Sequence, residues 1–140
     1  MKLCLIRATA DQSLANGTTS VLAFDKTDVN THPDTFAVDL TNDKITVYEA
    51  GWYRITFHAF VTPTAYTQLS FRSGALGDWT IITRQTNNGV DTAHLLNAAF
   101  LIYLAVGSEA QAGIYVSATG SPVAASTSND YAYLAVEALT

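Results

Sequence analysis

The sequence is poor in cysteine and in charge, and each shortage excludes a class of protein. One cysteine in 140 residues rules out an intramolecular disulfide framework and a multi-cysteine zinc site. Charged residues make up 14% of the chain, against about 25% in typical domains, whereas hydrophobic residues reach 49%. This composition argues against intrinsic disorder. It also predicts that part of the outer surface is apolar and needs a partner to cover it.

Basic residues and long hydrophobic runs are also scarce. Seven Lys and Arg stand against twelve Asp and Glu, a net charge of −5, which argues against a nucleic-acid partner. The longest apolar stretch, 98–106, is about half the length of a membrane span, so no membrane association is expected. Only four apolar residues follow Lys2 before Arg7, which is too few for a signal peptide.

What the sequence does contain is a series of short β-strand signals separated by turn residues. The pattern predicts one all-β domain, with polar loops at 25–34, 84–91 and 120–130 and turns at 16–17 and 42–43. The predicted strands cover 21–24, 36–40, 44–48, 52–61, 69–72, 79–84, 95–106, 112–118 and 131–139.

Two of these segments are apolar on both faces. In Leu95–Leu104 the even positions read Leu, Ala, Phe, Ile, Leu and the odd positions Leu, Asn, Ala, Leu, Tyr. Tyr131–Leu139 has the same character. A strand of a sandwich normally buries one face and exposes the other to solvent. These two strands therefore need a partner on their outer face, most simply another copy of the chain. The alternative for 95–106 is a buried helix.

Three segments occur in the order typical of a known family. They are ITVYEAGWYRITF at 45–57, LAVGSE at 104–109 and YLAVEAL at 133–139, preceded by VLAFD at 21–25. Together they resemble the signature of the tumour necrosis factor and complement globular-head superfamily. Glu109 falls one place late, and Ala135 stands where that family usually has glycine.

This resemblance implies a ten-stranded antiparallel jelly-roll sandwich that forms a tight homotrimer. The jelly-roll domain would cover residues 10–140, and residues 1–9 would form an N-terminal arm or edge strand. The Thr-, Ala- and Asn-rich texture resembles the bacterial and bacteriophage branch of the family. That branch implies a structural virion protein, made in the host cytoplasm and displayed on the virion surface.

Two roles in the virion are consistent with this resemblance. The first is a trimeric decoration (cement) protein that stabilises a phage head by binding its major capsid protein. The alternative is the receptor-binding tip or knob of a phage fibre, which would recognise a cell-surface glycan or protein.

The resemblance and the strand patterns also assign residues to surfaces. Leu3, Leu5 and Ile6 are predicted to dock on the capsid. Tyr53, Ile55 and Phe57 are predicted to face a core shared with Phe100, Ile102, Leu134 and Val136. Arg54 and Glu137 are expected to form an ion pair on a partner-covered face, within or between subunits. The alternative is that both reach solvent at the rim of the trimer. The predicted trimer interface consists of Arg54, Thr56, His58, Asn97, Ala99, Leu101, Tyr103, Tyr133, Ala135 and Glu137.

The sequence offers little for catalysis, and we predict no catalytic residue, no metal and no cofactor. His32, His58 and His94 could belong to a triad only if the fold assembled one, and no Gly-x-Ser-x-Gly elbow is present. Cys4, between two leucines, is interpreted as a small apolar strand residue.

Two weaker hypotheses concern ligands. The first is a calcium loop, which needs several oxygen ligands, drawn from Asp25, Asp28, Asn30, Asp34, Asp39 and Asp43. The second is an aromatic platform for sugars formed by Trp52, Tyr66, Phe71 and Trp79.

Overall fold

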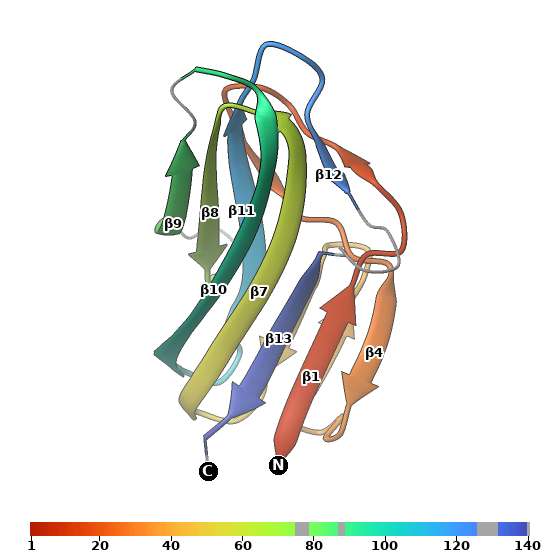
Figure 1. Ribbon diagram of the computed structural model, residues 1–140. Helices are drawn as coiled ribbons and strands as arrows, with labels where there is room; N and C mark the ends of the chain where they lie inside the picture. The colour runs from red at the N-terminus through yellow and green to blue at the C-terminus, as the bar shows by residue number, and fades with distance from the viewer. Residues whose placement is uncertain (75–78, 87–88, 126–131, 140) are drawn as a thin grey trace.

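The computed structural model describes residues 1–74, 79–86, 89–125 and 132–139. These residues form strands that lie in two sheets packed face to face, with antiparallel pairing throughout the strand ladders (Figure 1). The strands are β1 Lys2–Arg7, β2 Gln12–Ser13, β3 Thr19–Val21, β4 Lys26–Asn30, β5 Phe36–Asp39, β6 Lys44–Val47, β7 Gly51–Thr64, β8 Tyr66–Arg72, β9 Thr80–Thr86, β10 Thr92–Leu104, β11 Glu109–Ser117, β12 Val123–Ala125 and β13 Tyr133–Ala138.

The first sheet is organised around β7, its longest strand. β10 pairs along one edge of β7, and β13 and then β12 pair along the other. β1 follows β13, and β4 follows β1, so five strands stand side by side as β10-β7-β13-β1-β4 (Figure 1). The second sheet has the order β5-β6-β11-β8-β9, and β3 pairs with β11.

The core lies between the two sheets and is rich in aromatic rings. Phe57 of the first sheet stacks on Phe71 of the second, with ring centroids 6.5 Å apart. Phe100 meets both rings edge-on, at 5.9 Å and 5.2 Å. Edge-on and offset contacts of this kind add to the stabilisation from burial.

The predicted core assignment is confirmed. The five predicted core residues of β7 and β13 are at most 1% exposed, and those of β10 are half-buried and pack against the same cluster. The segment 95–106 is strand β10 rather than a buried helix, because it pairs with β7 over its whole length. Asp43 has a positive φ of 57°, and Gly17 one of 73°, as expected for the two predicted turns.

The prediction for the N-terminus is wrong. Residues 2–7 form β1, an interior strand that pairs with β13 on one side and β4 on the other. Cys4 and Ile6 are fully buried, so the segment belongs to the core rather than to an arm or an edge. Burial raises the pKa of the Cys4 thiol to about 12, which makes it an inert apolar residue.

The structure contains strands that the sequence does not predict. β4 and β12 lie within the predicted loops 25–34 and 120–130, and β2 was not predicted at all. β3 ends at Val21, where a strand was predicted to begin. Tyr131, the predicted start of the last strand, lies outside the described residues.

The two ends of the chain lie next to each other. Lys2, at the start of β1, is paired with Ala138, at the end of β13. Figure 1 shows both ends at the same end of the sandwich.

Candidate interaction surface

The outer side of the first sheet presents a row of side chains across four strands. Leu101 of β10 lies beside Arg54 of β7, which lies beside Glu137 of β13 and then Leu3 of β1. Because directly paired residues point to the same face of a sheet, the four side chains share one surface. We call this surface the open face. It consists of Leu3, Leu5, Trp52, Arg54, Thr56, His58, Leu95, Asn97, Ala99, Leu101, Tyr103, Tyr133, Ala135 and Glu137.

Large apolar side chains stand exposed on the open face. Trp52, Leu95, Leu101 and Tyr103 are each at least 50% exposed. Trp52 and Tyr103 meet edge-on with ring centroids 5.9 Å apart, so they form one aromatic pair rather than two isolated rings. Exposed apolar surface that continues across several strands is typical of a protein interaction site.

The polar residues of the open face bond mainly to one another. His58 forms a hydrogen bond with the Asn97 side chain, and its ring is stacked within 5° of parallel on the Tyr133 ring. Arg54 and Glu137 form an ion pair at 3.2 Å within one chain, which confirms the predicted pairing. This internal pairing lowers the cost of covering these groups with an apolar partner.

All ten residues predicted for the trimer interface belong to this one surface. The structure adds residues that sequence reasoning placed elsewhere. Leu3 and Leu5, assigned to a separate docking arm, are half-buried members of the open face. Ile6 points to the opposite side and is fully buried, so it is not available for docking.

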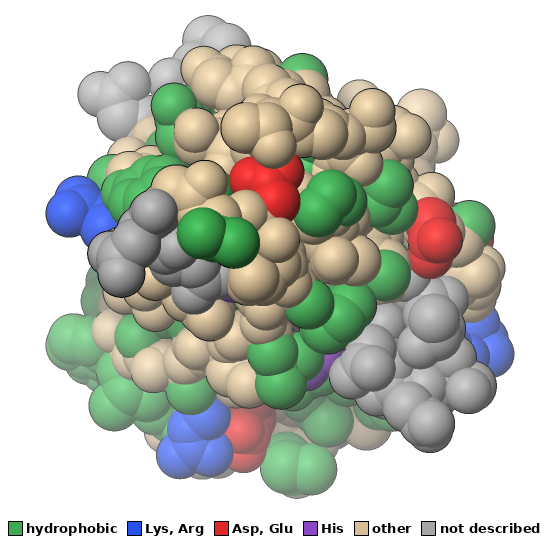
Figure 2. Space-filling model, turned by 45° about the horizontal axis from the view of Figure 1, so that its top comes forward, with side chains coloured by type: hydrophobic (Ala, Val, Ile, Leu, Met, Phe, Trp, Pro, Cys, Tyr) green, Lys and Arg blue, Asp and Glu red, His purple; other side chains and the backbone are tan. Residues whose placement is uncertain are grey.

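Charge is sparse elsewhere on the surface as well. In the view of Figure 2, the few charged side chains are scattered among hydrophobic side chains and the surface formed by the backbone and the other side chains. None of the described residues belongs to a helix that is long and apolar enough to cross a membrane.

The acidic residues proposed for calcium do not converge. Asp25 accepts hydrogen bonds from Thr9, and Asp28 pairs with Arg7. Asp39 accepts bonds from the turn that follows it, chiefly from Asn42, and these bonds lower its pKa. Among the described residues, no three His, Cys, Asp or Glu side chains gather as a metal site would require.

The three histidines lie in separate environments, so they form no triad. His32 is in the loop after β4 and contacts Thr31. His58 is on the open face, whereas His94 is fully buried on the opposite side of the same sheet. Thr67 Oγ1 lies 2.9 Å from His94 Nδ1, and burial lowers the pKa of His94.

The aromatic platform for sugars is also not formed. Phe71 is in the core, and Trp52 is on the first sheet. Trp79 contacts residues of the second sheet, where the Arg72 guanidinium lies 4.3 Å from its ring centroid. The four rings therefore cannot face one ligand.

Comparisons with known proteins reveal the fold and no closer relationship. No protein-family model and no curated protein matches the sequence. Several solved structures match nearly the whole chain. The globular domain of zebrafish complement 1qA protein superposes with a TM-score of 0.70 at 11% identity, covering 99% of this chain and 97% of that one.

Two further solved structures are similar to a comparable degree. For murine APRIL the TM-score is 0.69 at 9% identity, covering 97% of this chain and 98% of that one. For Eiger TNF from S. frugiperda it is 0.67 at 10% identity, covering 99% and 92%. The chain is thus an all-β protein with the jelly-roll sandwich of the tumour necrosis factor and complement 1q type.

Proposed function

We propose that this chain is a structural protein that assembles as a homotrimer through the open face and decorates a viral capsid. The observation that carries the proposal is the apolar surface that crosses β10, β7, β13 and β1. A sheet that exposes large apolar side chains on its outer side needs a layer there, and a second and third copy of the chain provide one.

The polar groups of the open face bond to one another, which supports another copy of the chain as the partner on this face. In a trimer built on this face, Arg54 and Glu137 would enter the interface already paired, and His58 already bonded to Asn97. The apolar Trp52, Leu101 and Tyr103 would supply the desolvated contacts that dominate binding energy. The surface therefore suits a tight and specific contact between copies.

The virion role rests on the sequence resemblance to phage proteins and on the scarcity of charge. Trimers match the local threefold points of an icosahedral shell. A trimer that binds only the assembled shell stabilises it by mass action. In this role the chain performs no catalysis, and its partners are its own copies and the major capsid protein.

The solution mass of the purified chain tests the trimer. Light scattering at micromolar concentration should give three times the 15.0 kDa of one chain. Leu101→Lys places a charge in the interface, where an unpaired ion costs several kcal/mol, and should yield monomers. Val106→Lys is the matched control, because Val106 is as exposed but lies outside the open face. A 15.0 kDa wild-type species would contradict the proposal.

Electron microscopy of the parent particle with labelled protein tests the virion role separately. Density at the threefold points of the head would support decoration. Density at a tail or fibre tip would instead identify a receptor-binding knob built on the same trimer.

A further inference from the structure

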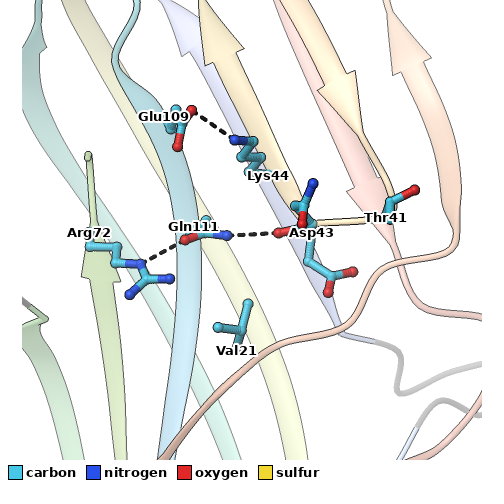
Figure 3. Close-up of a pocket in the computed structure, with 8 residues that line it drawn as sticks. Val21, Thr41, Asp43, Lys44, Arg72, Glu109 and Gln111 are labelled. Atoms are coloured by element: carbon cyan, nitrogen blue, oxygen red, sulfur yellow. Dashed lines mark hydrogen bonds and ion pairs between the residues drawn. The ribbon is translucent and has the colours of Figure 1, made fainter. Parts of the chain in front are cut away.

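A polar cavity of about 450 Å³ lies on the outer side of the second sheet (Figure 3). Its volume falls within the range of small-molecule sites. β6, β8 and β11 and the segments before β6 and at the end of β3 form its walls. The lining residues are Val21, Thr41, Asn42, Asp43, Lys44, Arg72, Glu109 and Gln111.

Gln111 holds the centre of this cavity in one orientation. Its side chain is 6% exposed, accepts a hydrogen bond of 2.6 Å from Arg72 Nε and donates one of 2.7 Å to the Asn42 carbonyl. These two bonds run in a line across Figure 3. The buried Gln111 amide therefore links Arg72 on one side of the cavity to Asn42 on the other.

Arg72 is immobilised, but its terminal nitrogens remain available. Nε bonds to Gln111, and the guanidinium packs over the Trp79 ring. Within the described part of the chain no carboxylate pairs with this guanidinium. An arginine held in this way is preorganised for a carboxylate, which it binds through two parallel N–H groups.

Asp43 provides the opposite charge on the other side. Its Oδ1 accepts a hydrogen bond of 2.8 Å from the Phe24 amide, and no Lys or Arg among the described residues pairs with it. Burial raises the pKa of Asp43, which shows that its charge is poorly compensated by the protein. In Figure 3 its carboxylate and the Arg72 guanidinium lie on opposite sides of Val21.

The remaining charges of the cavity neutralise each other. Lys44 Nζ pairs with Glu109 Oε1 at 2.8 Å. Glu109 Oε2 is buried with no hydrogen-bond donor among the described residues. The uncompensated charges are thus Arg72 and Asp43, and Glu109 Oε2 remains as a buried acceptor.

We propose that this cavity binds a small zwitterion, with its carboxylate on Arg72 and its ammonium group on Asp43. A simple anion would leave Asp43 without a cation and would be repelled by its carboxylate. A metal ion or a simple amine would be repelled by Arg72. Only a ligand with both charges complements both sides.

A titration of the full-length, isotope-labelled chain by NMR tests the proposal. The probes are glycine, 4-aminobutanoate and 6-aminohexanoate, compared with butanoate and butylamine. One of the zwitterions should cause saturable shifts at the Asp43 and Gln111 amides, and the singly charged probes should bind about tenfold more weakly or not at all. Equal responses to butanoate and to the zwitterions, or no saturable shift with any probe, would overturn the proposal.

Two variants and one matched control locate the site. Asp43→Asn keeps Oδ1 as an acceptor and suits the positive φ at this position, so the fold should survive while affinity falls about tenfold. Arg72→Met should have an effect of the same size. Arg84→Met, at an exposed arginine of β9, should leave affinity unchanged. Unchanged affinity in Asp43→Asn would overturn the assignment. The solution mass should not respond to any of these changes, so this inference and the trimer can fail independently.

Discussion

β10 and β11 are both apolar strands, but among the described residues only β11 is covered on its outer side. On β11, residues 110–114 are all buried, and the outward Gly113 lies beneath Trp79 and Thr19. On β10, every second residue from Leu95 to Tyr103 points outward and is exposed. Trp79 and Thr19 thus cover β11, whereas the outward residues of β10 stay exposed. The comparison indicates why association is expected on the first sheet and ligand binding on the second.

Phe57→Ala should destabilise the core that lies beneath both the open face and the polar cavity. The Phe57 ring lies between the sheets and contacts Phe71 and Phe100, and the cavity left by its loss should cost about 3–5 kcal/mol of unfolding free energy. Denaturant unfolding of the Leu101→Lys monomer measures this without the contribution of assembly. An unchanged midpoint would contradict the placement of the ring.

Gly113→Ala should damage only the covered side. A Cβ at Gly113 would lie 2.9 Å from both the Trp79 ring and Thr19 Cγ2, so these groups must move. Overpacking of this kind costs about 1–3 kcal/mol. Thermal unfolding should show the loss, while light scattering should still find the trimer. Loss of the trimer with an intact fold would mean that the two surfaces are coupled.

Acid should lower the unfolding free energy through His94, which is buried on the inner side of the first sheet. Because burial lowers the pKa of folded His94, the unfolded chain binds its proton first. The neutral histidine stabilises the fold fully above the unfolded pKa of about 6.5, and this stability is lost as pH falls below that value. The slope is at most about 1.4 kcal/mol per pH unit for one proton.

His94→Gln removes this titration and keeps a polar side chain near Thr67. The difference in unfolding free energy between wild type and variant should therefore shrink as pH falls from 7 to 5. A constant difference would show that His94 does not titrate in this range.

Arg54→Met and Glu137→Gln probe the open face with the smallest expected effect. The pair is 3.2 Å apart, and the Arg54 side chain is half exposed in the single chain, where such pairs contribute less than about 1 kcal/mol. A double-mutant cycle should give a small coupling in a monomer made by Leu95→Lys, whose new charge lies away from Arg54 along β10, and a larger one in the trimer. Equal couplings in both states would place the pair outside the interface.

The features that could be predicted from sequence are those that depend on the alternation of side chains along a single strand. The two faces of β10 and the inward residues of β7 follow from side-chain alternation, because neighbouring residues of a strand point to opposite sides. The ion pair between Arg54 and Glu137 follows from the family resemblance, which places their two strands side by side. In each case the residues involved are long-strand residues with clear patterns.

The features that could not be predicted depend on distant pairing. The apolar stretch of β1 is short, and its role is set by β13, at the other end of the sequence. β4 reads KTDVN, with no apolar alternation, because an edge strand is held by its backbone bonds and needs no buried face. The polar cavity joins Arg72, Asp43 and Gln111 from three parts of the chain, and no local pattern relates them.

The adjacency of the two chain ends determines how the domain responds to a pulling force. β1 and β13 are antiparallel and start and finish at the same edge, with Lys2 opposite Ala138. Their hydrogen bonds run perpendicular to the strands. Tension that draws the two ends apart therefore loads these bonds one pair after another, beginning at Lys2, rather than all at once. A tether fixed at both ends would therefore open the first sheet progressively from Lys2 at low force.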